Sequence, residues 1–171
     1  LLPIYALSEK GYKRIIELSS MSFLNNDDLS EPHINFEELF NKNDDIAIFS
    51  GTVFGLFGAL FEKGKFSEIK ELYSKLKLNY GDRFYLEIQR HGDTNELGFE
   101  KFNLNKSLEL EIPIIATNEV FYIDKNMHEA HDALICIKNK TYVSEKNRLK
   151  LSNQHYLKNN TEMSELFSDL P

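Results

Sequence analysis

The chain has a single cysteine, no tryptophan and no long hydrophobic run, and each of these absences narrows what it can be. One cysteine, Cys136, cannot form a disulfide within the chain, which agrees with a reducing cytosol. No stretch approaches the roughly 18 uncharged apolar residues that a membrane-spanning helix needs. The chain also lacks the Gly-x-Ser-x-Gly turn of serine hydrolases and the phosphate-binding P-loop. We therefore expect a cytoplasmic protein that uses neither of these two catalytic devices.

The charge balance is acidic, with 20 lysine and arginine residues against 27 aspartate and glutamate residues and a net charge of −7. A domain that binds nucleic acid by itself is usually basic, because neutralisation of phosphates drives that affinity. Hydrophobic residues make up 42% of the chain, which is ordinary for a globular protein. With 171 residues, the chain is long enough for one domain with a sizeable core. We expect such a domain, without strong DNA binding of its own.

Short apolar runs alternate along the chain with segments of helical periodicity. The expected strands are residues 1–7, 46–50, 84–88 and 112–116, and strand-like character continues to residue 122. The expected helices are residues 11–25, 35–40, 53–61, 67–78, 94–109, 127–138 and 161–167, with a polar loop at 26–31. This alternation is typical of a parallel sheet with crossover helices. Four strands are too few for a closed barrel.

Two of the expected helices begin with a capping signal. Asn35 is a suitable N-cap for the helix at 35–40, because its side chain can accept a hydrogen bond from the first turn. Asp93 is the corresponding candidate for the helix at 94–109, with Glu96 three residues later at the reciprocal position of a capping box.

Polar side chains follow two of the expected strands at their C-terminal ends, where α/β proteins place their chemistry. Thr117, Asn118 and Glu119 follow the last strand, and His91 follows the strand at 84–88. A neutral imidazole is a good ligand for zinc or manganese. A lone histidine in a loop is more often simply solvated, so the strand-end position alone does not assign a metal.

A second histidine pair, His128 and His131, lies three residues apart and therefore on one helix face. Its spacing is one residue short of the zincin pattern His-Glu-x-x-His. We interpret these residues as the first turn of a helix, and Cys136, within an apolar run, as a small core residue.

Several segments occur in an order that points to one family. They are Leu1–Tyr12, Ile46–Phe57 (IAIFSGTVFGLF), Phe84–Gly92 (FYLEIQRHG), Pro113–Ile123 (PIIATNEVFYI), Ala130–Ile137 (AHDALICI) and Glu162–Pro171 (EMSELFSDLP). Together they resemble the PHP (polymerase and histidinol phosphatase) domain of the bacterial replicative DNA polymerase III alpha subunit. The resemblance implies an α/β fold that is part of a distorted (β/α)7 barrel. It also implies that residues 1–171 are the C-terminal two-thirds of that domain, without the N-terminal strands, their His-x-His motif or the polymerase palm.

The resemblance also implies where metal ligands would lie. His91 matches a histidine of the family's Leu-Glu-Ile-Gln-x-His-Gly strand, and Glu119 matches the aspartate of its Thr-Asn-Asp-x-His motif. Phe121 stands where that motif has histidine, and Thr52 stands where many members have a cysteine ligand. A phenyl ring cannot bind a metal, and a neutral hydroxyl is a poor substitute for a thiolate. We therefore expect His91 and Glu119 to be remnants of a degenerate site, with Zn2+ or Mn2+ present only if that site is intact.

The function implied for the complete protein is DNA-directed DNA synthesis with Mg2+. The implied local role is a scaffold without a cofactor of its own, which docks the proofreading exonuclease and other replicase subunits. Contact with DNA would come through the rest of the protein, and no membrane is involved. One alternative is an active metal-dependent phosphoesterase, acting as a 3′–5′ exonuclease or a pyrophosphatase, with His91 and Glu119 as surviving ligands. Another is a small standalone α/β domain.

Overall fold

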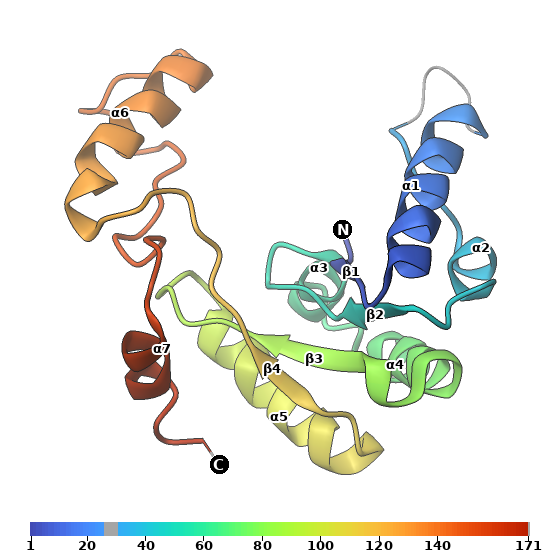
Figure 1. The fold of residues 1–171 in the computed structure, drawn as a ribbon. Coiled ribbons are helices and arrows are strands. Elements are labelled where there is room, and N and C mark those ends of the chain that lie inside the picture. Colours follow the sequence, from blue (N-terminus) through green and yellow to red (C-terminus); the bar gives the residue numbers. More distant parts are fainter. Residues whose placement is uncertain (26–30, 171) are drawn as a thin grey trace. The chain divides into compact units, whose positions relative to one another are not determined.

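The sheet has four strands in the order β1-β2-β3-β4, and their succession along the chain is the same as their order in space (Figure 1). This computed structural model describes residues 1–25 and 31–170. The strands are β1 (Ile4–Ala6), β2 (Ile46–Phe49), β3 (Phe84–Ile88) and β4 (Ile114–Ala116). The prediction of four strands at these places is confirmed, although β1 and β4 are shorter than expected.

The expectation that all strands are parallel is wrong for β1. β2 and β3 are parallel, but β1 pairs with β2 in the antiparallel direction, with Ile4 opposite Ile48 and Ala6 opposite Ile46. A three-residue strand at the edge of a sheet has one neighbour only, so its direction is set by how the connecting segment packs. An antiparallel edge strand on a mostly parallel sheet is common in α/β proteins. Alternation of helices and strands in the sequence carries no information on this point.

The chain divides into two compact units, which are described separately. The first unit comprises Leu1–Glu87 and Phe102–Ile115, and the second comprises Ile88–Lys101 and Ala116–Pro171. The helices that lie wholly in the first unit are α1 (Glu9–Leu24), α2 (Phe36–Phe40), α3 (Leu56–Glu62) and α4 (Phe66–Tyr80), followed by the short 3-10 turn Gly81–Arg83. The helix α5 (Glu96–Leu110) belongs partly to each unit.

The core of the first unit is built on β2, β3 and one face of α4. All four residues of β2 are buried, as expected for a strand covered on both faces. Helix α4 places Ile69, Tyr73, Leu76 and Tyr80 in the core, at the spacing of one helix face. The Tyr73 ring contacts Phe57 with a centroid distance of 4.6 Å, and its hydroxyl donates a hydrogen bond to Asn103 Oδ1 at 2.9 Å. This polar contact satisfies the hydroxyl of a fully buried phenol.

The second unit contains the first part of α5 together with the 3-10 turn Lys125–Met127, α6 (His128–Asn139) and α7 (Asn160–Leu166). Residues 120–122 run beside residues 155–157, joined by hydrogen bonds from Phe121 N–H to His155 O (2.9 Å) and from Leu157 N–H to Tyr122 O (3.0 Å). Asp132 in α6 forms a two-point ion pair with Arg148, and both side chains are largely buried. Cys136 is also buried, which confirms its expected place in the core.

Helix capping agrees with the sequence at one predicted helix start and differs at another. Asn35 caps α2, and its side chain and that of Glu38 form the reciprocal hydrogen bonds of a capping box. Asp93 does not directly precede α5, because the helix begins at Glu96 and Asn95 has a left-handed φ of 67°. The Glu96 carboxylate still accepts a hydrogen bond from the Asp93 N–H at 3.3 Å, so half of the expected contact exists.

Helix α3 begins at Leu56, three residues after the predicted start at Val53. Residues 51–55 form a turn in which Gly51 has a φ of +79° and the Gly55 N–H bonds to Thr52 O at 2.9 Å. The predicted start was too early because the apolar residues of this turn have the same spacing as those of the helix that follows. The predicted loop at 26–31 lies, except for Glu31, outside the described residues.

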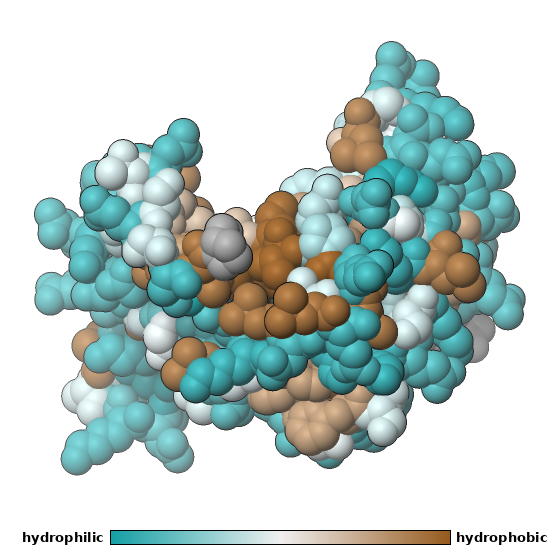
Figure 2. All heavy atoms as spheres, turned by 90° about the horizontal axis from the view of Figure 1, so that it is seen from below, coloured by the Kyte–Doolittle hydropathy of each residue, from teal (hydrophilic) through white to brown (hydrophobic). Residues whose placement is uncertain are grey.

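The face drawn in Figure 2 is mainly hydrophilic, with groups of hydrophobic side chains between the polar ones. Large hydrophobic residues exposed on the second unit include Leu97, Phe121, Ile123, Leu134, Ile137, Tyr142 and Leu157. Within the described residues, no helix combines the length and the apolar character needed to cross a membrane.

Gly11 lies in α1 at a position where no side chain fits. A Cβ atom there would be 1.9 Å from the backbone oxygen of Asp45. Replacing glycine by alanine inside a helix normally stabilises it by about 1 kcal/mol. We expect Gly11→Ala instead to destabilise the protein by about 1–3 kcal/mol, because the helix must move away from Asp45. Thermal unfolding tests this sign, with Ser19→Ala at an exposed position of α1 as the control; a stabilised Gly11→Ala variant would contradict it.

Candidate metal centre

His91 lies just after β3, and its backbone and ring are both held by the carboxylate of Glu96. The backbone N–H groups of His91 and Gly92 donate to Glu96 Oε2 at 2.7 Å each, and His91 Nδ1 lies 3.1 Å from Glu96 Oε1. Gly92 has a φ of +81°, a value that glycine adopts without strain and that turns the chain toward α5. The turn and the first residue of α5 therefore fix the position of His91, whose side chain is buried.

The surroundings of Glu96 favour its charged form. Burial alone would raise the pKa of this carboxyl, but the His91 side chain and the backbone N–H groups of Gly92 and His91 outweigh burial and lower the pKa below its usual value. Glu96 is therefore a carboxylate at neutral pH, and its Oε1 accepts a hydrogen bond from the Nδ1–H of His91. His91 Nε2 has two neighbours, the Glu119 N–H at 3.2 Å and Asn118 Oδ1 at 3.1 Å.

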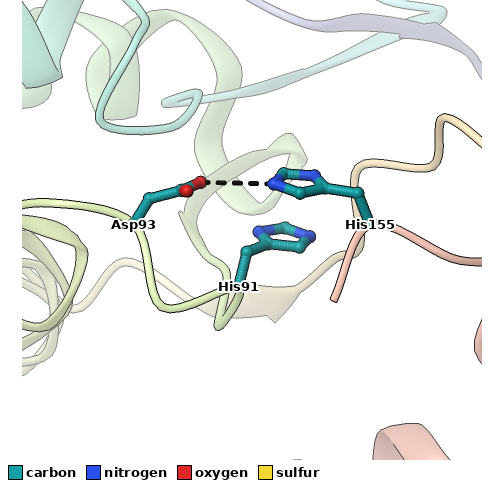
Figure 3. A group of neighbouring side chains, drawn as sticks. All are labelled: His91, Asp93 and His155. Carbon is teal, nitrogen blue, oxygen red and sulfur yellow. Dashed lines mark ion pairs between the residues drawn. The ribbon is translucent and has the colours of Figure 1, made fainter. Parts of the chain in front are cut away.

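His155 lies directly against His91, and the two imidazole rings are stacked with a centroid distance of 4.1 Å and an interplanar angle of 1° (Figure 3). The side chain of His155 is fully buried. Its Nδ1 lies 3.3 Å from the backbone oxygen of Glu119, and its Nε2 lies 3.4 Å from Asp93 Oδ2. Among the described residues, none forms a hydrogen bond with Nε2.

Burial and the neighbouring His91 lower the pKa of His155, and together they outweigh the opposite effect of Asp93. A neutral His155 has one ring proton. The contact with the Glu119 oxygen places that proton on Nδ1, so that Nε2 presents a lone pair. The buried lone pair then faces a carboxylate oxygen, and this arrangement suits a cation between them.

His91, Asp93 and His155 together form a group whose ligand atoms all lie within 4.8 Å of one another. A cavity of about 450 Å³ is lined by two of the three, His91 and Asp93, and also by Arg90, Glu100 and Gln154. Two nitrogen ligands and one carboxylate are a donor set typical of zinc and of other first-row transition metals. In the described part of the chain, this is the group of side chains that can hold a metal ion.

Of the four residues that the sequence connects with a metal site, only one belongs to this group. His91 belongs to the group. Glu119 contacts both histidines through its backbone N–H and oxygen, whereas its exposed carboxylate is not a member of the group. Phe121 packs its ring against His155 and His131, with centroid distances of 5.3 and 5.4 Å. Thr52, in the first unit, accepts a hydrogen bond from the Phe54 N–H at 3.3 Å and so closes a turn.

The ligand set implied by the resemblance therefore fits a metal poorly. Both nitrogens of His91 already have partners, and Phe121 offers no ligand atom. The other histidine pair has structural contacts: His128 Nε2 forms a hydrogen bond with Leu151 O at 3.0 Å, and the His131 ring packs against Phe121 and Tyr122. Neither residue is a member of the metal-ligating group found among the described residues.

Sequence reasoning missed two members of the group, Asp93 and His155. The sequence suggested Asp93 as a helix cap, whereas α5 begins three residues later, at Glu96. His155 lies in a polar segment without periodicity, far from His91 in the sequence, and no local spacing connects them. The sequence carries one weak sign of the burial of His155. His155 and Tyr156 are two large ring residues within an otherwise polar segment, and such residues are often buried.

Arg90 joins three parts of the second unit. Its guanidinium forms two hydrogen bonds with Glu100 (2.9 and 2.6 Å) and two with Asp169 (2.5 and 2.9 Å), and it also donates to Leu166 O at 2.7 Å. The same group lies 4.8 Å from the centre of the Phe167 ring. Arg90 thus holds the segment after α7 against the start of α5.

Comparison with known proteins identifies the family. The family model described as "PHP domain" matches residues 2–91, just over half of the chain. DNA polymerase III subunit alpha of Caulobacter vibrioides is 34% identical over 170 residues, covering 99% of this chain and 15% of that protein. The subunit alpha of Rickettsia prowazekii is 36% identical over 168 residues (98% and 14%), and that of Borreliella burgdorferi is 33% identical over 171 residues (99% and 15%).

The chain thus spans about one-seventh of the length of these relatives. The matched region ends at His91, so Asp93, Glu119, Phe121 and His155 lie beyond it. The similarity to subunit alpha nevertheless continues over almost the entire chain. Since the matched segment carries the mixed α/β fold described above, the chain belongs to the PHP domain family.

Proposed function

We propose that this chain is the PHP part of a replicative DNA polymerase III alpha subunit, a bacterial nucleotidyltransferase that makes DNA on a template with Mg2+. The observation that carries the proposal is the similarity to alpha subunits over 98–99% of the chain. As part of the proposal, the four strands belong to a distorted (β/α)7 barrel, and residues 1–171 make up part of that domain without the polymerase palm. The complete protein would act in the cytoplasm and contact DNA through its other regions.

The proposed local role is a scaffold that docks the proofreading exonuclease and other replicase subunits. Phe121 and Thr52 support this role, because neither can replace the ligands of a multinuclear metal centre. The net charge of −7 also suits contact with proteins better than contact with DNA. Exposed hydrophobic residues such as Ile123, Ile137 and Leu157 offer apolar area for such a contact.

Hydrogen exchange on the complete protein, with and without the purified proofreading exonuclease of the same organism, tests the docking role. We expect slower exchange of backbone amides within this chain when the exonuclease is present, because a stable interface excludes water from them. Protection confined to other regions of the protein would overturn the role as a docking module. A primer-extension assay on the same preparation tests the polymerase assignment independently.

The second candidate function is a metal-dependent phosphoesterase. The observation in its favour is the group of His91, Asp93 and His155 beside a cavity. These residues would hold a metal ion, which supplies an activated water for attack on phosphorus. Release of nucleotides from the 3′ end of single-stranded DNA, or of phosphate from pyrophosphate, measures this activity. It should depend on added Zn2+ or Mn2+ and fall with His155→Asn; activity that His155→Asn leaves unchanged would assign the reaction elsewhere.

A further inference from the structure

We propose that the second unit binds a single divalent transition-metal ion, with zinc as the best match, through His155 Nε2 and Asp93 Oδ2. Neither residue is among those that the sequence pattern assigned to a metal. The proposed site holds one ion, in contrast to a multinuclear centre, and it does not depend on the docking of an exonuclease.

The first argument is the state of His155. Its Nδ1 proton is directed to the Glu119 oxygen, and among the described residues none forms a hydrogen bond with Nε2. A buried acceptor without a donor destabilises the folded chain, and here it also faces a carboxylate. A metal ion accepts both lone pairs at once and removes this destabilisation. A second-sphere hydrogen bond from Nδ1–H to a backbone oxygen is also the usual companion of a histidine ligand that binds through Nε2.

The second argument is the distance between the two ligand atoms. Zinc binds histidine nitrogen and carboxylate oxygen at about 2.0–2.2 Å, and tetrahedral geometry then separates the two atoms by about 3.3–3.5 Å. His155 Nε2 and Asp93 Oδ2 are 3.4 Å apart. The pair therefore has the spacing of two ligands on one ion without any movement, whereas a direct N–H···O hydrogen bond would be shorter, at about 2.7–3.2 Å.

The third argument concerns His91 and the cavity. The His91 ring stacks on His155, its Nδ1 is held by Glu96, and its Nε2 lies beside the Glu119 N–H and Asn118 Oδ1. His91 therefore supports the His155 ring in its position, and it becomes a third ligand only by giving up its contacts with the Glu119 N–H and Asn118 Oδ1. The cavity of about 450 Å³ beside Asp93 admits water to the remaining coordination positions. The expected site has two or three protein ligands and is completed by water.

Zinc content after equilibrium dialysis tests the proposal on the complete protein. The protein is first stripped with a chelator and then dialysed against a series of buffered free Zn2+ concentrations, and bound zinc is measured by elemental mass spectrometry. We expect the wild type to bind one equivalent of zinc at this site. The variants His155→Asn and Asp93→Asn should bind that equivalent with at least tenfold lower affinity. His33→Asn, which alters an exposed histidine of the first unit, should bind zinc like the wild type.

Equal zinc binding by the wild type and both site variants would overturn the proposal, and so would a wild type that binds none. Because a variant at a buried histidine can unfold locally, a second measurement uses the wild type alone. Co2+ added to the stripped protein should produce the visible absorption bands of a four- or five-coordinate site, and Zn2+ should abolish them. Absence of these bands, with nuclear magnetic resonance showing His155 protonated on both nitrogens, would assign the Asp93 contact to a plain ion pair.

Discussion

Replacing Tyr73 by alanine is expected to lower the free energy of unfolding of the first unit by about 3–5 kcal/mol, the usual cost of removing a buried aromatic side chain. Tyr73 is fully buried and contacts the rings of Phe57 and Phe84 at 4.6 and 5.7 Å. Alanine would leave a cavity between α4 and the sheet, which rigid neighbours cannot fill. Hydrogen exchange of the backbone amides of β2 and β3 in the complete protein measures the loss.

Two control variants separate packing from polarity at this position. Tyr73→Phe keeps the ring but leaves Asn103 Oδ1 without its hydroxyl donor, so it should cost about 1–3 kcal/mol. Tyr12→Ala removes an aromatic ring that is 59% exposed, and it should change the exchange of β2 and β3 little. A Tyr73→Ala variant as stable as Tyr12→Ala would show that the core does not close around α4 as described.

Replacing Arg90 by alanine is expected to destabilise the second unit by about 2–4 kcal/mol. The main cause is Glu100, whose side chain is 5% exposed and would lose its cationic partner. Removal of one member of a buried ion pair costs about 3–5 kcal/mol. The expected value is somewhat lower because water in the cavity lined by Arg90 and Glu100 can reach the carboxylate. Thermal unfolding, together with hydrogen exchange of α7 and residues 167–170, measures the effect.

Two control variants test whether the buried contact with Glu100 is the cause. Asp169 is 62% exposed, so Asp169→Asn should cost no more than about 1 kcal/mol. Combining Arg90→Ala with Glu100→Gln should recover part of the loss, because no buried charge then remains unpaired. If the single and double variants are equally stable, the ion pair is not what holds the segment after α7.

The sequence was sufficient for those parts of the fold that local chemistry determines. Helix α4 follows from its apolar spacing, and the start of α2 follows from Asn35 and Glu38. The direction of β1 did not follow, since an edge strand is positioned by tertiary packing. The beginning of α5 did not follow either, because it depends on the left-handed backbone of Asn95, a residue compatible with many conformations.

The candidate site was predictable to the extent that the strands determine it. His91 was identified because the C-terminal end of β3 is a regular position, at which side chains of neighbouring strands converge. Its partner His155 comes from an irregular segment, and its place depends on the pairing of residues 120–122 with residues 155–157. Such contacts between distant loops have no sequence period, so composition and spacing could not identify Asp93 and His155.

The burial of Cys136 makes the chain useful for site-directed labelling. Because Cys136 is a buried residue of α6, a maleimide should react with the native chain far more slowly than with an unfolded one. A second cysteine placed at an exposed position of the chain could therefore carry a fluorophore or a spin label without removal of the natural one. Slow labelling of Cys136 itself would then report how often α6 detaches from its neighbours, on a timescale of minutes to hours.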